Sequence, residues 1–476
     1  MNKRFAVCRI VAATLTVFAL GACTLEPHYE RPAAPMPAFY PQYESTSAQQ
    51  QASAADLLSD WRSFVRDPYL RQLIELALTN NRDLRQAALK VAQYEAEYRI
   101  VRAELGPSIT ATGTHSASHQ SGVTTKSTSL ELGTSAWEID FFGRIRSLKD
   151  QALEQYLSTD AARRSTQISL ISTTAGDYLT WLADRALLDV TERTVASYRD
   201  TYETTLRAAN LGSGSMEDVQ SARTSLTSAM ANLAAYRRAV EQDRNNLIAV
   251  IGCPLPDGFP DDRALPDEPL FAAVPEGLPS TLLTERPDII EAEHALKSAN
   301  AYIGAARAAF FPTVSLTATG GVASNGLSSL FKAGSGAWAF EPSISVPIFQ
   351  FGSLRASLDS ATISKNIYVA AYEGTIQTAF KEVSNALAAR ATYVDQTAAD
   401  LQYVDAAQQY YDIANARYRG GLDSFLTLLT AQRTLFSAQT QLVTDRAAQQ
   451  TNMVTLYTAL GGGWRKDAQV QETAAK

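Results

Sequence analysis

The chain has 476 residues and a formal net charge of −7, and its basic residues form no stripe of the kind that marks a nucleic-acid surface. Length alone would allow about three domains of average size. The missing basic stripe argues against a nucleic-acid partner. Small and hydroxyl side chains are abundant while glycine and proline are few, which favours long, closely packed helices.

Residues 1–22 have the pattern of a lipoprotein signal peptide. Lys3 and Arg4 precede an apolar run that is too short to span a membrane as a mature helix, and small residues lead to Cys23. We expect a covalent lipid, diacylglyceryl and N-acyl, on Cys23. The alternative is an ordinary secretory signal that happens to contain this cysteine. Thr24 permits sorting to the outer membrane, because in lipoproteins generally an Asp there causes retention in the inner membrane.

Residues 23–58 are rich in proline, alanine, serine and glutamine, which predicts an extended tether. An amphipathic helical pattern follows over residues 60–78. A second helical pattern begins at Asp83 and ends before Pro107.

Two segments, about 107–141 and about 312–350, alternate apolar residues with serine or threonine and predict β-hairpins. The last strand is expected to reach Ile348. Leu130 and Leu132 stand on the opposite parity to Trp137, which predicts a bulge or an early loop. Strands of this length with terminal Trp and Phe are typical of a transmembrane β-barrel. The alternative is a half-exposed hairpin on a soluble core.

Long helices follow each hairpin, over about 143–209 and 352–419, and each contains a single internal glycine. Sixty helical residues extend roughly 90 Å. After a short turn, each is followed by another helix whose apolar residues recur at alternating steps of three and four. Such a stripe predicts a packed coiled-coil seam.

The chain repeats itself. Asp83 and Asp288 stand 205 positions apart, and Gly143 and Gly352 stand 209 apart. We therefore expect two tandem structural repeats, over residues 59–260 and 279–464. A linker over 261–278 would join them, and a tail over 465–476 would follow.

Four candidate membrane strands in one chain cannot close a barrel, and an open edge in lipid is costly because its backbone groups have no partner. Several chains must then share one barrel. The helices are too polar to lie in the membrane, so they must project into an aqueous space, and the lipid anchor places them in the periplasm.

Nothing in the sequence predicts catalysis or a metal site. His115 and His119 would share one face of a strand, but they lack a third ligand nearby and are expected to be wetted side chains. Cys253 follows a helix and is expected to fill space. No phosphate-binding glycine loop or nucleophile elbow occurs. We expect no cofactor other than the lipid.

The chain resembles the TolC-type outer membrane factors, in the OprM-like lipoprotein branch of efflux channels. The resemblance covers nearly the whole chain and rests on these motifs: Asn80-Asn81-Arg82-Asp83-Leu84, Trp137-Glu138-Ile139-Asp140-Phe141-Phe142-Gly143-Arg144, Glu285-Arg286-Pro287-Asp288-Ile289, Ile303-Gly304-Ala305-Ala306-Arg307-Ala308-Ala309-Phe310-Phe311-Pro312, Arg417-Tyr418-Arg419 and Ala431-Gln432-Arg433.

The resemblance implies a mixed α/β membrane protein, a homotrimer with a 12-stranded transmembrane β-barrel, four strands per chain, continued by a long periplasmic α-helical barrel. It implies an outer membrane of a Gram-negative bacterium, a periplasmic adaptor (membrane fusion protein) and an inner-membrane transporter of the resistance-nodulation-division class. The expected function is passive export of drugs and other toxic small molecules. The sequence does not name the substrates.

A periplasmic gate is also implied, near the turns over Arg207–Arg223 and Arg417–Arg433. Thr430 stands where relatives carry an Asp, so a carboxylate ring at that position is in doubt, and Asp423 or Asp218 could replace it. The candidate gate residues are Asp218, Tyr418, Arg419, Asp423, Leu426 and Arg433.

Two other functions fit parts of the pattern. The outer channel of a type I protein-secretion system has the same fold, but lipidation and the Arg417-Tyr418-Arg419 motif favour efflux. A trimeric surface adhesin is disfavoured, since an adhesin barrel lies at one chain end and would not be duplicated.

Overall fold

The computed structural model describes residues 24–37, 60–260, 262–266, 268–274 and 285–462. The signal peptide, Cys23, most of the tether, the minor part of the linker and the tail after 464 lie outside these residues. The chain forms two compact units, one of Met1–Ala34, Ala88–Ala162 and Asp288–Thr375, the other of Pro35–Ala87, Arg163–Pro287 and Ile376–Lys476.

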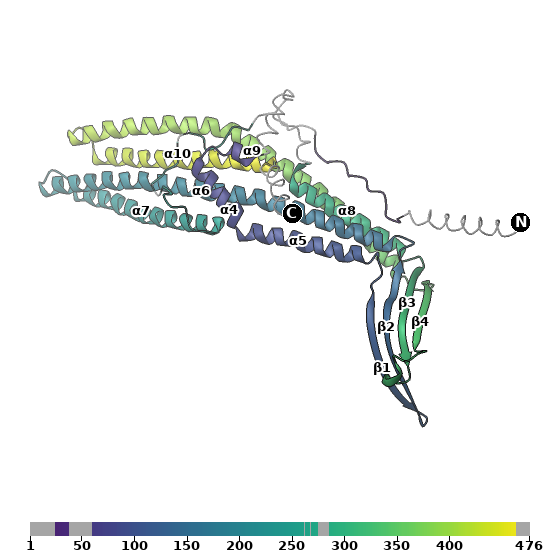
Figure 1. Ribbon diagram of the computed structural model, residues 1–476. Coiled ribbons are helices and arrows are strands. Elements are labelled where there is room, and N and C mark those ends of the chain that lie inside the picture. Colours follow the sequence, from purple (N-terminus) through teal and green to yellow (C-terminus); the bar gives the residue numbers. More distant parts are fainter. Residues whose placement is uncertain (1–23, 38–59, 261, 267, 275–284, 463–476) are drawn as a thin grey trace. The chain divides into compact units, whose positions relative to one another are not determined.

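The first unit contains one antiparallel sheet whose strands follow sequence order, β1 (Thr110–Gln120), β2 (Val123–Ile139), β3 (Thr313–Ser324) and β4 (Gly336–Ser345) (Figure 1). Ser121 and Gly122 join β1 to β2 and both have positive φ, of 52° and 80°. A two-residue turn with two positive φ values matches the strand twist and fixes the register of the hairpin.

The predicted irregularity in β2 is confirmed. The β2–β3 register shifts between Thr134 and Trp137. Ala136 has a φ of 51°, and its N–H donates to Thr317 Oγ1 (3.0 Å) instead of a strand carbonyl. The extra residue reverses the parity of side chains along the strand, which is why Leu130 and Trp137 follow opposite patterns.

The expected extent of the last strand was wrong. β4 ends at Ser345, which pairs with Thr313, and does not reach Ile348. Pro312 precedes Thr313 and has no N–H, so β3 cannot extend to meet residues beyond Ser345.

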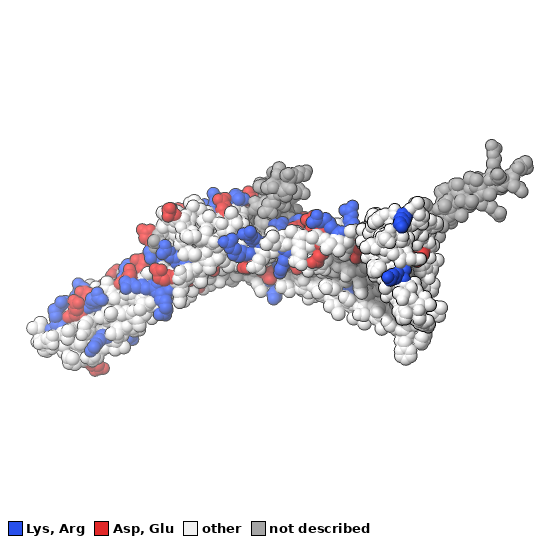
Figure 2. Space-filling model, turned by 60° about the horizontal axis from the view of Figure 1, so that its bottom comes forward, with Lys and Arg blue, Asp and Glu red and all other residues white. Residues whose placement is uncertain are grey.

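Charged side chains are sparse in the sheet. The strands contain only Lys126, Glu131, Glu138 and Glu341. Figure 2 shows Lys, Arg, Asp and Glu scattered over the helical part of the visible face and a largely uncharged surface over the strands.

The helices in chain order are α3 (Trp61–Phe64), α4 (Pro68–Asn80), α5 (Arg82–Ala103), α6 (Arg144–Asn210), α7 (Met216–Ile251), α8 (Pro287–Ala308), α9 (Ser353–Arg419) and α10 (Phe425–Ala459), with a 3₁₀ turn η2 (Leu327–Ser329). The order helix, two strands, long helix, helix therefore occurs twice. No helix within the described ranges is long and apolar enough to cross a membrane.

One predicted helix over 60–78 proves to be two, α3 and α4. Val65 ends α3 and forms an antiparallel bridge with Phe271. Asp67 then caps α4 by accepting from the N–H of Leu70 (2.8 Å), and Pro68 occupies the first helical position. The break depends on a residue about 200 positions away, so local periodicity could not reveal it.

The second unit is held by a buried aromatic cluster around Phe64. Its ring stacks on Tyr457 (centroids 4.0 Å apart) and on Phe271 (5.0 Å). All three rings are buried. Burying three aromatic side chains contributes about 1.5–3 kcal/mol each before entropy is counted, so this cluster fixes α3 against the end of α10.

Two side chains at corresponding places of the duplicated pattern join helix starts to helix ends. Asn81 Nδ2 donates to the carbonyl of Val250 (2.9 Å), and Arg286 Nη1 donates to the carbonyl of Ala459 (2.5 Å). The first pair links the start of α5 to the end of α7, and the second does the same for α8 and α10. A carbonyl in the last turn of a helix lacks an intrahelical donor, and these side chains supply one.

Candidate functional site

The two helix–helix turns, α6–α7 and α9–α10, are built in the same way. Gly212 and Gly421 have φ values of 79° and 69°, a conformation that glycine adopts without a steric penalty. Ser215 Oγ accepts from the N–H of Glu217 (3.0 Å), and Ser424 Oγ accepts from the N–H of Thr427 (3.3 Å). Each serine thereby caps the helix that follows its turn.

A small apolar cluster lies next to these turns and joins the helix pair α6–α7 to the helix pair α9–α10. Ala222 of α7 packs with Phe425 and Leu429 of α10, and Tyr202 and Tyr418 pack against them. The rings of Tyr418 and Phe425 meet edge to face, with centroids 6.0 Å apart.

Tyr418 and Arg419, at the end of α9, both bind α6. Arg419 Nη2 forms an ion pair with Asp200 Oδ2 (2.7 Å), in which both side chains are more than half exposed. Tyr418 Oη lies 3.3 Å from Thr205 Oγ1. Because the Thr205 hydroxyl donates to the carbonyl of Thr201 (2.8 Å), the tyrosine must be the donor in this bond.

Two other candidate gate residues also have specific partners. Arg433 Nη2 donates to Ser225 Oγ (3.1 Å), which joins α10 to α7. Asp423 accepts from Arg417 Nε (2.6 Å) and Nη2 (3.2 Å) in its own turn. The hydrogen bonds from Arg417 hold the pKa of Asp423 below its usual value. Asp423 is therefore neutralised locally and is poorly suited to an isolated axial charge.

Three further positions are placed as follows. Leu426 is 68% exposed beside its turn. Asp218 is half-buried in the first turn of α7, where a carboxylate complements the helix N-terminus. Thr430 Oγ1 donates to the carbonyl of Leu426 (2.8 Å) within α10.

Sequence reasoning missed the partners of the candidate gate. Asp200 and Thr205 lie up to two helical turns before Arg207–Arg223, the turn that the family resemblance indicates. Their spacing of five in α6 gives no motif. Only the side-by-side packing of α6 on α9 brings them to Arg419 and Tyr418.

A buried amide further along the same helices belongs to the Ala431-Gln432-Arg433 motif, and the motif alone does not indicate its role. Gln432 Nε2 donates to Ser197 Oγ (3.0 Å) and to Thr201 Oγ1 (2.9 Å). The Thr201 hydroxyl donates to the carbonyl of Ser197, so its oxygen is left to accept, which fixes the orientation of the amide. Gln432 Oε1 has no hydrogen-bond partner among the described residues.

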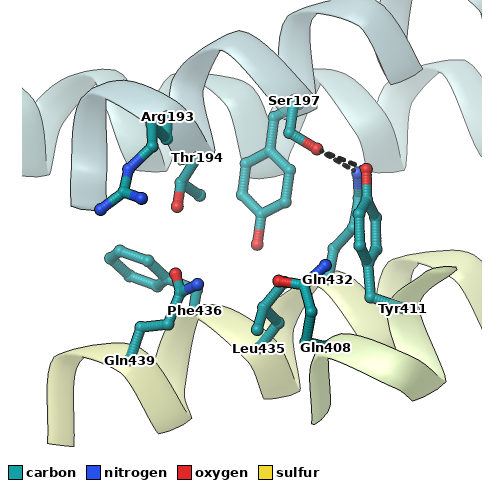
Figure 3. A pocket seen from close by; sticks show the side chains of 10 residues that line it. Arg193, Thr194, Ser197, Gln408, Tyr411, Gln432, Leu435, Phe436 and Gln439 are labelled. Atoms are coloured by element: carbon teal, nitrogen blue, oxygen red, sulfur yellow. Dashed lines mark hydrogen bonds between the residues drawn. The ribbon is translucent and has the colours of Figure 1, made fainter. Parts of the chain in front are cut away.

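This amide borders a cavity of about 190 Å³ between α6, α9 and α10. Figure 3 shows Ser197, Tyr411 and Gln432 meeting at one end of the cavity and Arg193 and Gln439 at the other. Ser197 Oγ and Tyr411 Oη are 3.1 Å apart. The cavity thus has a mostly uncharged, hydrogen-bonding lining.

His115 and His119 each lie within hydrogen-bond distance of a threonine on the neighbouring strand. His115 Nδ1 lies 2.8 Å from Thr128 Oγ1, and His119 Nδ1 lies 2.9 Å from Thr124 Oγ1 across the β1–β2 pair. Over the described residues, no three His, Cys, Asp or Glu side chains are grouped so that they could hold a metal ion.

Asp243 of α7 and Asp184 of α6 form a hydrogen-bonded carboxyl pair. Burial first, then repulsion from Asp184, raises the pKa of Asp243 to about 6, and burial also raises the pKa of Asp184. The folded chain then binds more protons than the unfolded chain between about pH 4 and 6. Its stability therefore falls as pH rises through that window and levels off above it.

We expect Asp243→Asn to raise the unfolding temperature at pH 7 and to flatten the stability profile between about pH 4 and 6. Thermal unfolding followed by circular dichroism over a pH series measures both. Glu241→Gln, an exposed carboxylate two residues away, is the control and should leave the profile unchanged. Because Asp184 keeps a pKa raised by burial, some slope remains, and an Asp243→Asn profile as steep as that of the parent would contradict the assignment.

A model of the outer membrane efflux protein family matches residues 73–253 and 278–462. The chain belongs to this family. The antibiotic efflux pump outer membrane protein ArpC and the toluene efflux pump outer membrane protein TtgC, both of Pseudomonas putida, are each 50% identical to it over 467 residues, which is 96% of this chain and of each relative.

A solved structure of similar fold is the open state of the MtrE outer membrane channel of Neisseria gonorrhoeae. It is 35% identical, covers 93% of this chain and 99% of its own, and superposes with a TM-score of 0.83. As an outer membrane efflux protein, the chain is located in the outer membrane and forms the exit duct in efflux. The family, the location and the efflux role expected from sequence are confirmed.

Proposed function

We propose that three copies of this outer membrane efflux protein close a 12-stranded barrel, four strands per chain, continued by a periplasmic α-helical barrel. Within the described sheet, β1 and β4 each have a single neighbour. An unpaired strand edge in lipid is costly, and single-chain membrane barrels have at least about eight strands. This pair of open edges is the observation that carries the proposal, and the number three follows from the family resemblance.

The two halves of the chain act as tandem structural repeats, over residues 59–260 and 279–464, flanking the linker 261–278. The family model matches two separate segments, 73–253 and 278–462, and the order of helices and strands recurs between them. The corresponding bonds from Asn81 to Val250 and from Arg286 to Ala459 give further support.

The trimer serves as the passive outer duct of a tripartite pump, with a periplasmic adaptor and an inner-membrane transporter of the resistance-nodulation-division class. The names of the two P. putida relatives specify antibiotic and toluene efflux, which suggests hydrophobic drugs and solvents as cargo. The duct performs no catalysis. A protein-secretion channel is the alternative.

Deletion of the gene in a strain lacking paralogues tests the efflux function. Accumulation of a fluorescent dye and susceptibility to solvents and antibiotics should rise together and return to normal with the intact gene. Unchanged accumulation of every compound tested would refute efflux, and loss of a secreted protein instead would favour the secretion channel.

Lipid on Cys23 remains a proposal, supported by the preceding signal pattern and by Thr24. Cys23→Ser should abolish labelling by a fatty-acid analogue, whereas Cys253→Ser should retain it. Labelling that persisted in Cys23→Ser would refute the assignment.

The contacts of Tyr418, Arg419 and Arg433 with α6 and α7 form the closed gate at the periplasmic turns. They join the two helix pairs of one chain near the turns, so a movement of one pair away from the other must break them. Asp218 adds a charge and Leu426 an exposed apolar side chain to the candidate gate, whereas Asp423 acts by holding its own turn through Arg417.

A further inference from the structure

One stripe of α8 carries side chains that all face the same short segment of the chain. The stripe consists of Glu293, Lys297, Asn300, Gly304 and Arg307, spaced by four, three, four and three residues, so it follows one face of the helix. The segment is residues 24–31, hereafter the N-terminal segment. It contains no helix or strand, and its backbone is therefore free to bind side chains.

The middle of the stripe binds the first half of the segment. Asn300 Nδ2 donates to the carbonyl of Pro27 (2.8 Å) and to Glu26 Oε1 (3.2 Å). Arg307 Nη1 donates to the carbonyl of Leu25 (3.1 Å). Asn300 is fully buried, and both of its partners are acceptors, so its amide orientation is fixed by the segment.

The start of the stripe binds the second half. Arg31 donates from Nε (3.1 Å) and Nη2 (2.5 Å) to the two oxygens of Glu293, and Tyr29 Oη donates to Glu293 Oε1 (3.3 Å). Lys297 Nζ lies 3.1 Å from Glu293 and 5.3 Å from the Tyr29 ring centroid. Burial opposes ionisation of Glu293, but the hydrogen bonds from Arg31 and Lys297 outweigh it and lower its pKa.

The segment and the stripe match in length. The contacts run antiparallel, from Leu25 at Arg307 to Arg31 at Glu293. Six residues of extended chain span roughly 20 Å, and fourteen residues of helix span roughly 21 Å. A single register therefore satisfies every contact along the stripe.

The backbone of Glu26 approaches the backbone of α8 closely at Gly304, so this helix can receive the segment only where glycine stands. A Cβ at this position would lie 3.0 Å from both the Cα and the N of Glu26, and 2.4 Å from Ser147 Oγ. At the end of the segment, a Cβ on Gly143 would lie 3.1 Å from the Cα of Thr24. Glycine is needed at both places for the segment to lie in contact with α8 and α6.

The corresponding helix of the first half, α5, lacks this stripe. With the offset of 205, the five positions correspond to Ala88, Ala92, Glu95, Arg99 and Arg102. A long arginine side chain stands where Gly304 gives room, and alanine replaces the Glu293 carboxylate. The described residues of α5 include no buried side chain. Each chain has one N-terminal segment, and only one of its two corresponding helices is built to receive it.

We propose that the α8 stripe is a specific binding site for the chain's own N-terminal segment, and that it holds Thr24 at Gly143, between β2 and α6. Resting on the proposed lipidation, this site fixes where the lipid-bearing end enters the membrane. The N-terminal segment is then docked on α8 at the junction of β2 and α6, and does not act as a flexible tether over residues 24–31.

A chemical cross-link tests the register in the full-length chain. In a Cys253→Ser background, Tyr29→Cys/Lys297→Cys should be joined within one chain by a short bifunctional maleimide in most molecules, since Lys297 Nζ lies 5.3 Å from the Tyr29 ring centroid and Asn300 and Gly304 are left intact. Tyr29→Cys/Ala92→Cys is the matched control on α5 and should not. Cross-linked monomers on a non-reducing gel support the proposal. No cross-link, or cross-linked dimers, would overturn docking within one chain.

A second measurement uses accessibility. The cysteine introduced by Tyr29→Cys should react with a maleimide about tenfold faster when Asn300→Ala or Gly304→Leu is added. The first substitution removes two hydrogen bonds to the segment, and the second places a side chain against the backbone of Glu26. Glu95→Ala and Arg99→Leu are the corresponding changes in α5 and should leave the rate unchanged. Equal rates in all variants would refute the site. Neither readout requires efflux, so its failure and a failure of the efflux function are distinguishable.

Discussion

The double variant Tyr418→Phe/Arg419→Ser should raise the ion conductance of the purified channel in planar bilayers at least about tenfold, because each of the three proposed chains loses roughly 1.5 kcal/mol and about 1.4 kcal/mol already changes an equilibrium tenfold. The exposed Arg419–Asp200 ion pair contributes about 0.5 kcal/mol, and the Tyr418–Thr205 hydrogen bond contributes about 1 kcal/mol. Both join α9 to α6, so both are lost when the helix pairs separate.

The control is Arg193→Ser. Its ion pair with Asp189 is at least as exposed but lies within α6, so removing it should not change the conductance. Exchange of the charges, Arg419→Asp with Asp200→Arg, should restore low conductance that Arg419→Asp alone loses. A double variant that conducted like the parent, while remaining folded, would show that these residues do not hold the gate.

Gly252→Ala should destabilise the protein far more than Gly212→Ala. Both glycines have positive φ, of 71° and 79°, so alanine costs about 1–2 kcal/mol at either place. At Gly252, which ends α7, the new Cβ would also lie 2.7 Å from the backbone oxygen of Asn80. Backbone cannot yield as a flexible side chain does, and overpacking adds about 1–3 kcal/mol. At Gly212 no heavy atom of the described chain lies within 4 Å.

Thermal unfolding of the two purified variants measures the difference. If both substitutions lowered the unfolding temperature equally, the close approach of α4 to the end of α7 would be wrong. Gly461 is the corresponding residue at the end of α10, where the nearest atom is the Arg286 Cγ (3.0 Å). Gly461→Ala should therefore be intermediate, since a side chain can move.

Where a boundary is set by a local residue, the sequence predicted it well. The long helices begin at Arg144 and Ser353, directly after Gly143 and Gly352, and end at Asn210 and Arg419. Glycine and proline change the backbone of the residues next to them, so their effect can be predicted from the sequence alone.

Features set by distant partners were not predictable. The break between α3 and α4 depends on Phe271, and the end of β4 depends on where β3 begins. At the gate, Tyr418 and Arg419 were identified through the family motif, but Asp200 and Thr205 were not. Their position is set by the rotation of α6 about its axis against α9, which a spacing in sequence does not encode.

The binding of the N-terminal segment to α8 also imposes an order on folding. Arg31 and Glu293 are separated by 262 positions, so the segment is synthesised long before its stripe exists. Contacts of such separation form late, after local helices and hairpins. The N-terminal segment therefore stays undocked until the second half of the chain has been synthesised. Its docking can occur only after α8 has folded.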